Sequence, residues 1–396
     1  MPAHGDHEWR VTVRPASTTL SPRRDVVVAF DLEGRPTSLF AGGDTYKRSL
    51  ASDLYGRRTE GGARRRWRVP RDRAADLLER SLTIAAAARS AVGRGERLPG
   101  VEGAAAEAAL ADRLDTVLGW TPERLQDERR RFLNAYAPIA ILPPDQYGAV
   151  VLQATFGCSW NRCTYCTFYQ GRPFQVRPIP AFREHVGAVR DLLGRAAVGR
   201  PGIFLADGNA LVLSNDRLRP VFEAATAAFP GRPAAGFVDV FSGERKTAEA
   251  WRELRAWGLG RVAIGVETGS DRLLAYLNKP GGASEAAAFV ALLKEAGLDV
   301  SVILMVGAGG RRFAADHVEA SADLLARLPL TGSDLIYLSP FVRQHDSAYA
   351  ERAAADGLED LTEAELGAQD RALRAAARAA APLTRVARYH IDEFVY

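Results

Sequence analysis

The sequence predicts an α/β fold: a full or partial barrel of parallel strands with helices outside, preceded by a mixed, largely helical N-terminal extension. Two observations predict it. Short, continuous apolar runs recur six times between residues 149 and 338, as expected for strands that are buried on both faces of a parallel sheet. Amphipathic stretches with helical spacing separate these runs. Right-handed crossovers curl such units into a barrel.

The expected barrel elements alternate in chain order. The apolar runs predict strands over residues 149–154, 202–206, 235–240, 262–266, 300–306 and 334–338. The stretches between them predict helices over residues 181–196, 217–228, 247–257, 284–296 and 314–327.

The N-terminal part of the chain is more varied. It predicts a polar arm over residues 1–25, a short strand at 26–30, an Arg- and Gly-rich loop at 56–73, and helices near 74–89, 103–118 and 122–135. Thr121 and Pro122 suit a helix start, as N-cap and first helical residue. Pro143-Pro144 then interrupts the chain. We therefore expect three parts: an extension over 1–144, a barrel core over 145–345, and a C-terminal helix and tail over 346–396.

Composition is that of a soluble globular protein, with 47% hydrophobic and 25% charged residues. No stretch reaches the roughly 18 apolar residues that cross a bilayer, and Met1–Arg10 lacks the apolar core of a signal peptide. These features predict a cytoplasmic protein without a membrane partner. The net charge of +4 does not by itself indicate nucleic acid. A basic run surrounds Trp67, and it is either a solvated face or a contact for RNA or a phosphate-bearing substrate: Arg64, Arg65, Arg66, Arg68, Arg71 and Arg73.

The three cysteines of the chain, Cys158, Cys163 and Cys166, lie within nine residues. Clustered thiols in odd number favour a metal site in a reducing compartment over a disulfide framework. A structural zinc site needs a fourth ligand, and no histidine lies at a finger-like offset. A plant-type ferredoxin has the same C-x4-C-x2-C spacing but needs a fourth cysteine. The pattern therefore favours a [4Fe–4S] cluster with three ligated irons and one open iron.

The segment Gln153–Tyr169 resembles the radical S-adenosylmethionine (SAM) superfamily, because a strand leads into a cysteine triad that ends Cys163-Thr164-Tyr165-Cys166. The usual family spacing is three residues and then two, whereas this chain has four and then two. The residues around the cysteines resemble those of the Elp3/MiaB/NifB branch. The resemblance to the superfamily extends over residues 145–396. It implies that SAM binds the open iron and is cleaved by one electron, giving a 5′-deoxyadenosyl radical that removes hydrogen from a substrate.

The resemblance also implies a set of cofactor contacts at the ends of barrel strands. Tyr165 fills the aromatic position between the last two cysteines. Asp207-Gly208-Asn209 stands where a glycine-rich turn of the family holds the SAM amino group. Three further positions would face the rest of SAM: Glu267 the methionine or ribose, Ser301 a ribose hydroxyl, and Gly307 the adenine. An ordinary polar turn, helix capping and strand packing are the alternatives for these residues.

Polar residues near the C-terminus are candidates for substrate contacts. Arg343, His345 and Asp346 follow the sixth predicted strand, where they either contact substrate or form a solvated loop. Tyr389 and His390 lie in an aromatic tail that either packs or reaches the barrel mouth.

The sequence therefore predicts a radical SAM enzyme with an external one-electron reductant of the flavodoxin or ferredoxin type. A small-molecule substrate is favoured, because no separate RNA-binding module is visible. Modification of tRNA or a peptide is the runner-up, motivated by the basic run. A non-catalytic Fe–S or zinc protein is the alternative from a different functional class.

Overall fold

The chain forms two compact units in a computed structural model that describes residues 9–61, 63–391 and 396. The described part of the first unit lies within residues 9–137 and 188–200, with residue 396; that of the second lies within 138–187 and 201–391. The sequence predicts this boundary near residue 145. Its N-terminal arm and C-terminal tail fall partly outside the described residues, at 1–8 and 392–395.

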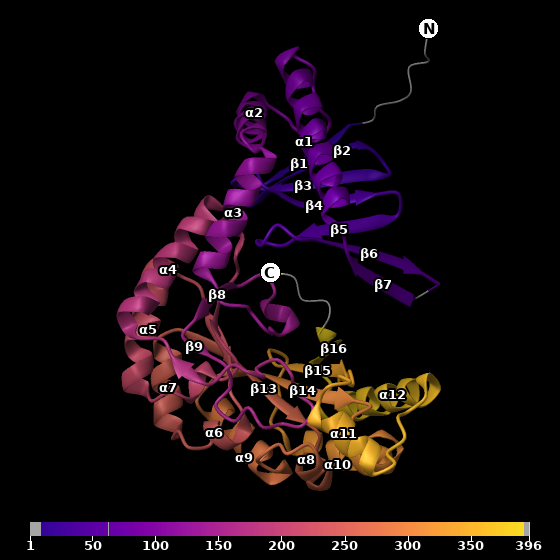
Figure 1. The fold of residues 1–396 in the computed structure, drawn as a ribbon. Coiled ribbons are helices and arrows are strands. Elements are labelled where there is room, and N and C mark those ends of the chain that lie inside the picture. The colour runs from indigo at the N-terminus through magenta and orange to yellow at the C-terminus, as the bar shows by residue number, and fades with distance from the viewer. Residues whose placement is uncertain (1–8, 62, 392–395) are drawn as a thin grey trace. The chain divides into compact units, whose positions relative to one another are not determined.

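The first unit is an antiparallel sheet with the strands in sequence order, β1 to β7 (Figure 1). The strands are β1 (Arg10–Arg14), β2 (Ser17–Arg23), β3 (Val26–Asp31), β4 (Pro36–Ala41), β5 (Asp44–Arg48), β6 (Leu54–Glu60) and β7 (Ala63–Arg68). Three helices follow: α1 (Arg71–Gly93), α2 (Ala104–Leu118) and α3 (Pro122–Ala135). Alternate strand residues such as Leu20, Val28 and Phe30 join Leu77 and Ala85 of α1 in one apolar core.

This sheet is larger than the sequence analysis expects. Residues 10–23 form β1 and β2 rather than an arm, and residues 54–68 form the β6–β7 hairpin rather than a loop. Arginines fill most positions of β7, so the apolar alternation that signals a strand is missing there. Pairing with β6 along its whole length nevertheless gives this segment its backbone partners. The three predicted helices are present, and the Thr121 side chain caps α3 as expected.

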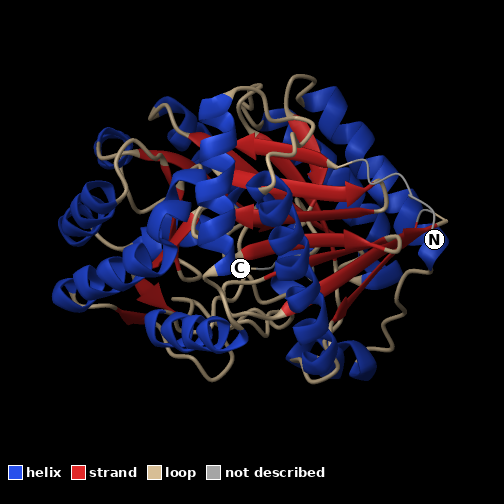
Figure 2. Cartoon of the chain, turned by 90° about the horizontal axis from the view of Figure 1, so that it is seen from above, coloured by secondary structure: helices blue, strands red, loops and turns tan. Residues whose placement is uncertain are grey.

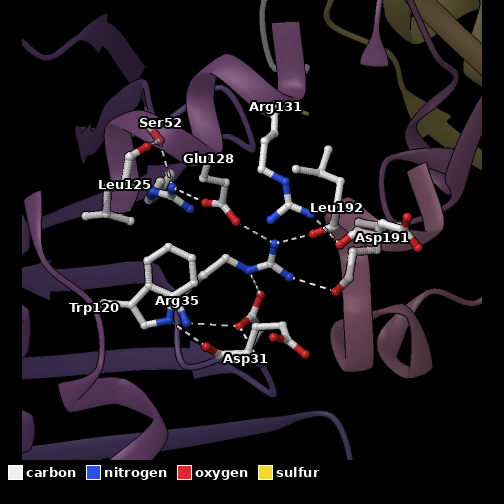
Figure 3. Close-up of polar contacts among 12 residues, drawn as sticks. Asp31, Arg35, Ser52, Trp120, Leu125, Glu128, Arg131, Asp191 and Leu192 are labelled. Carbon is white, nitrogen blue, oxygen red and sulfur yellow. Dashed lines mark hydrogen bonds and ion pairs between the residues drawn. The ribbon is translucent and has the colours of Figure 1, made fainter. Parts of the chain in front are cut away.

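A buried arginine holds several segments of the first unit together (Figure 3). The Arg35 side chain donates to Asp31 Oδ2 and Glu128 Oε1, both at 2.7 Å. It also donates to the carbonyl oxygens of Leu192 and Leu193, each at 2.9 Å. Arg35 is only 1% exposed, so these partners replace the water that its charge has lost. The turn after β3, helix α3 and residues 192–193 are thereby joined at one point.

The second unit is a parallel sheet in the order β16-β15-β14-β13-β12-β11-β8. Its strands are β8 (Val150–Gln153), β11 (Ile203–Ala206), β12 (Ala234–Phe237), β13 (Leu259–Glu267), β14 (Asp299–Val306), β15 (Leu335–Pro340) and β16 (Arg385–Arg388). Because β8 and β16 stand at opposite ends of this order, the barrel is partial. The α/β barrel prediction is confirmed, and β16 adds a seventh strand in the segment where a helix and tail were expected.

Helices connect these strands and lie along the outer side of the sheet (Figure 1). They are α4 (Ile179–Leu193), α5 (Asn215–Ala228), α6 (Val240–Gly243), α7 (Ala248–Ala256), α8 (Asp271–Tyr276), α9 (Ala283–Glu295), α10 (Gly310–Arg327), α11 (Ala348–Ala355) and α12 (Glu363–Ala380). The helices and strands of both units can be followed by colour in Figure 2. Among the described residues, no helix has the length and apolar character needed to span a bilayer.

A small antiparallel pair, β9 (Thr155–Phe156) with β10 (Gln175–Val176), follows β8. It closes the base of a loop over residues 157–174. All three cysteines lie in this loop, directly beyond the carboxyl end of the first barrel strand.

Candidate active site

A cavity of about 200 Å³ opens at the carboxyl ends of the barrel strands. Its wall combines residues that follow β11, β12, β15 and β16 with the ends of β13 and β14 and with the cysteine loop. Its lining residues include Cys158, Cys163, Tyr165, Cys166, Gly208, Asp239, Glu267, Lys279, Gln344 and Tyr389. In parallel α/β sheets this edge is where ligands bind.

The three cysteines are free thiols that all line this cavity. Burial raises the pKa of Cys163 to about 12 and that of Cys166 to about 11. The charge of Lys279 opposes the rise at both thiols, whereas the neighbouring cysteines add to it. The thiols therefore lie within electrostatic reach of one another around a shared space.

The cysteine loop is fixed to the segment after α8 by three hydrogen bonds, two of which involve a side chain. Thr164 N donates to Leu277 O at 2.9 Å, and Trp160 Nε1 donates to Asn278 O at 2.9 Å. In return, Asn278 Nδ2 donates to Arg162 O at 2.7 Å. These bonds hold the loop on both sides of Cys163, so the thiol positions are set before any ligand binds.

The donor set suits an iron–sulfur cluster. Thiolates are the usual ligands of such clusters, and these three thiols face open space rather than each other in disulfides. Within residues 9–61, 63–391 and 396, no three His, Cys, Asp or Glu side chains are grouped so that they would hold a single metal ion. A cluster bonds each thiolate to a different iron, and three free thiols that line one cavity are a suitable ligand set for it.

The Asp207 carboxylate lies buried beside the cysteine loop, 2% exposed. Its Oδ1 accepts from Tyr169 at 3.3 Å, whereas Oδ2 accepts no hydrogen bond from a described residue. Arg172 approaches Oδ2 only to 3.8 Å, which is an ion-pair distance and not a hydrogen bond. Burial raises the pKa of Asp207 to about 6, although Arg172 and Tyr169 oppose the rise. The site therefore retains a poorly compensated negative charge.

The neighbours of Asp207 have structural contacts of their own. Gly208 lines the cavity, and a Cβ at this position would stand 2.6 Å from the Tyr169 ring, so only glycine fits. Asn209 is fully buried and donates to Ser159 of the cysteine loop at 2.7 Å. It also donates to Asp239, which lines the cavity. Asn209 thus joins the cysteine loop to the end of β12 from behind the cavity wall.

Glu267 ends β13 at a bulge and has a φ of +68°, a left-handed conformation that is costly for a residue with a Cβ. Its carboxylate lies 3.3 Å from Lys279 Nζ, and both side chains are 11% exposed. A Cβ at Gly265 would approach Glu267 Oε1 to 2.4 Å, so this glycine provides the room for the carboxylate. Burial lowers the pKa of Lys279, but Glu267 and Cys163 outweigh it and the pKa is raised. Lys279 therefore remains a cation next to the cysteines.

The Glu267–Lys279 pair gives a stability prediction. We expect Lys279→Met to destabilise the cluster-free protein by about 3 kcal/mol, because the substitution leaves the Glu267 carboxylate buried without its cation. The double variant Glu267→Gln/Lys279→Met should regain most of this loss. Urea unfolding followed by circular dichroism measures both changes. A single variant as stable as the wild type would show that the pair contributes little.

The two remaining predicted SAM contacts, Ser301 and Gly307, lie outside the cavity wall. Ser301 is fully buried near the amino end of β14 and accepts from Arg261 at 3.4 Å. Gly307 follows β14 with a φ of +95°, and its N–H donates to Gln369 Oε1 at 2.6 Å. Neither residue is part of the described cavity wall.

The predicted substrate residues divide into two groups. His345 and Asp346 are exposed, and Arg343 forms an ion pair with Asp360 at 3.0 Å. None of these three is among the residues that line the cavity, although the adjacent Gln344 is. Tyr389 lies just beyond β16, is 2% exposed and lines the cavity, and its hydroxyl has no hydrogen-bond partner among the described residues. His390 is half-buried beside it.

Sequence reasoning missed Lys279 and Asp239 as cavity residues. Asp239 falls inside the predicted strand at 235–240, whereas β12 ends at Phe237, so Asp239 stands just beyond the carboxyl end of the actual strand. Lys279 lies after α8, far in sequence from every strand end, and no spacing pattern indicates it. Only the three-dimensional arrangement brings it to Glu267.

Comparisons with known proteins agree with this site. The sequence model of the radical SAM superfamily matches residues 152–324. The heme chaperone HemW of Mycobacterium tuberculosis strain H37Rv is 26% identical over 221 residues, which cover 54% of this chain and 54% of HemW. The chain thus spans about half the length of the curated relatives it matches.

Two solved structures are remote neighbours. The coproporphyrinogen III oxidase HemN from Escherichia coli aligns with 14% identity and a TM-score of 0.43, covering 63% of this chain and 54% of HemN. The hydrogenase maturase HydG from Carboxydothermus hydrogenoformans aligns with 16% identity and a TM-score of 0.40, covering 78% and 66%. The superfamily match lies on the barrel that contains the cysteine loop. Residues 152–324 are therefore similar to the radical SAM superfamily.

Proposed function

We propose that this chain is a radical SAM enzyme that cleaves SAM reductively and removes hydrogen from a small, largely apolar substrate. The observation that carries the proposal is the cysteine loop, which directs three free thiols into a cavity at the carboxyl ends of the barrel strands. When bound, the cluster and SAM supply a carbon radical, and methionine and 5′-deoxyadenosine are the products. The electron comes from an external reductant of the flavodoxin or ferredoxin type.

Residues of the chain have distinct proposed tasks at this site. Cys158, Cys163 and Cys166 would hold the cluster, and Tyr165 between them forms one side of the SAM position. The turn at Asp207-Gly208 faces a SAM amino group with a buried carboxylate that lacks a full set of partners. Glu267 accepts a hydrogen bond from a hydroxyl or ammonium group of SAM. Ser301 and Gly307 stay proposals drawn from the resemblance alone.

The cavity wall supports an uncharged substrate. Seven large apolar side chains line it: Ile141, Phe168, Phe237, Ile303, Phe341, Val342 and Ile391. The charges on the wall already have partners, because Glu267 pairs with Lys279 and Asp239 binds Ser242 N at 2.9 Å. A charged substrate would lose its water without gaining a counter-ion. The Tyr389 hydroxyl is available to orient one polar group of a bound substrate.

Product analysis tests the proposal. Anaerobic reconstitution with iron and sulfide, followed by dithionite and SAM, should release 5′-deoxyadenosine, measured by liquid chromatography with mass spectrometry. A protein that carries about four irons per chain yet releases no 5′-deoxyadenosine would contradict the assigned activity.

Heme or porphyrin binding is the second candidate. It is favoured by the similarity to the heme chaperone HemW over 221 residues and by the aromatic side chains of the cavity wall. In the same samples, hemin should then give a Soret band that shifts on binding. A shift without any release of 5′-deoxyadenosine would favour this candidate over the first.

Two finer predictions from the sequence remain proposals. We propose a relationship to the Elp3/MiaB/NifB branch because the residues of the cysteine loop resemble those of that branch. We propose a cytoplasmic location because the clustered free thiols need a reducing compartment. Substrate contacts by Arg343, His345, Asp346 and His390 also remain proposals, and they require these side chains to turn toward the cavity mouth.

A further inference from the structure

The outer face of the β6–β7 hairpin in the first unit gathers basic side chains. Residues that are paired across an antiparallel ladder share a face, and alternate residues along a strand share one too. The register pairs Tyr55 with Arg68 and Arg57 with Arg66, and it pairs Lys47 of β5 with Tyr55. We call these five residues the basic face.

The opposite face of the hairpin is the one that packs inward. There, Trp67 meets Tyr46 edge to face at 6.4 Å, and Gly56 is the residue that leaves room for the Trp67 ring. Two arginines of the hairpin share that side: Arg58 is neutralised by Asp44 at 2.5 Å, and Arg65 lies 5.9 Å from the centre of the Trp67 ring. The core of the unit therefore explains the inward residues, but it gives no reason for the charges on the basic face.

Two exposed cations of the basic face lack a counter-ion. Neither Lys47 nor Arg57 forms an ion pair within the described part of the chain. Arg68 pairs with Asp53 at 2.8 Å, and Asp53 is shared with Arg129. An anionic ligand along the hairpin would compensate the charges of Lys47 and Arg57.

Aromatic and hydroxyl groups accompany the charges. The Arg66 guanidinium lies 4.7 Å from the centre of the half-buried Tyr55 ring, and Phe40 shares this face through its pairing with Thr45. Basic side chains interleaved with aromatic rings bind single strands by contacting phosphates and stacking bases. Thr45 and Thr59 on the same face offer hydroxyls to a ribose 2′-hydroxyl.

We propose that the basic face binds single-stranded RNA. The proposal does not depend on SAM chemistry, because it concerns the first unit, and it predicts binding by cluster-free protein as well. Along a strand, side chains on one face repeat about every 7 Å, so the hairpin presents a row of cations to a row of phosphates.

Fluorescence anisotropy with labelled oligouridylate of about 12 nucleotides tests the surface on the full chain. Binding at about 50 mM salt should weaken by at least tenfold at about 200 mM, as expected for three or more phosphate contacts. Lys47→Ala/Arg57→Ala should raise Kd at least tenfold and reduce the log–log salt slope by about 1.4. Tyr55→Leu should raise Kd about tenfold through lost stacking, with less change in the slope.

The matched control is Arg80→Ala/Arg97→Ala, which removes two exposed arginines outside the basic run, one on α1 and one after it, and should leave Kd within about twofold. Melting temperatures of all variants verify folding. Equal weakening by both double variants would overturn the proposal, as would an absence of salt-sensitive binding by the wild type. Equally tight binding of polyglutamate would instead indicate an acidic protein partner, and equally tight binding of oligodeoxythymidylate would remove the assignment to RNA.

Discussion

Cys163→Ala should bring the iron content of the reconstituted protein from about four per chain to near zero and abolish SAM cleavage. Cys163 is the middle cysteine of the loop, and hydrogen bonds from Asn278 and to Leu277 fix the residues on either side of it. Two remaining thiols cannot hold three irons. Iron analysis and the visible absorbance of the cluster measure the loss directly, without depending on turnover.

Gln170→Ala is the matched control for this variant. Gln170 is exposed in the same loop, so its loss should leave iron content and cleavage unchanged. Circular dichroism of both proteins without iron verifies that the fold survives. Full iron loading of Cys163→Ala would mean that the cluster binds elsewhere and that the proposed site is wrong.

Asp207→Asn should stabilise the cluster-free protein at neutral pH. Burial raises the pKa of Asp207 from 3.8 to about 6, a change that corresponds to a penalty of about 3 kcal/mol on the ionised native state. Asparagine keeps the shape without the charge, and we expect a gain of about 2 kcal/mol. Function and stability conflict here, because a buried anion without full partners costs stability until a cation binds beside it.

The pH dependence of this gain has a definite sign. Above pH 6 the carboxyl is ionised in both the folded and the unfolded chain, so the penalty applies in full. As the pH falls toward 3.8 the native carboxyl gains a proton first, and the penalty disappears. The difference in unfolding free energy between variant and wild type should therefore narrow from about pH 7.5 to pH 4.5. Urea titrations at both pH values measure it.

Asp346→Asn serves as the comparison for Asp207→Asn, because Asp346 is exposed in the loop after β15. It should change stability by less than about 0.5 kcal/mol at either pH. If Asp207→Asn instead lowered stability at pH 7.5, the ion pair with Arg172 at 3.8 Å would outweigh the burial of the carboxylate.

The barrel was predictable because its strands are continuous apolar runs. Val150–Gln153, Ile203–Ala206 and Asp299–Val306 are almost wholly buried, so hydrophobicity alone marks them. The β16 strand, Arg385–Arg388, has two arginines and no fully buried residue, so its sequence carries no such mark. It pairs with β15 through backbone groups, which any side chain permits.

The candidate site was predictable where chemistry and chain position coincide. The cysteines and Gly208 follow strands directly and line the cavity. Ser301 was inferred from its strand alone, yet a strand has two ends, and this residue lies toward the end away from the cavity. The position of Lys279 in the cavity wall depends on the path of the chain after α8, and no local sequence pattern predicts that path.

The Arg35 contacts constrain how this protein can be divided. Residues 188–200 belong to the first unit although they follow the cysteine loop in sequence. A fragment that ends at residue 137 would deprive the Arg35 guanidinium of the Leu192 and Leu193 carbonyls and leave a cation buried with half its acceptors. Expression of the N-terminal portion alone should therefore yield insoluble material, and truncation studies require a circularly permuted or internally linked gene instead.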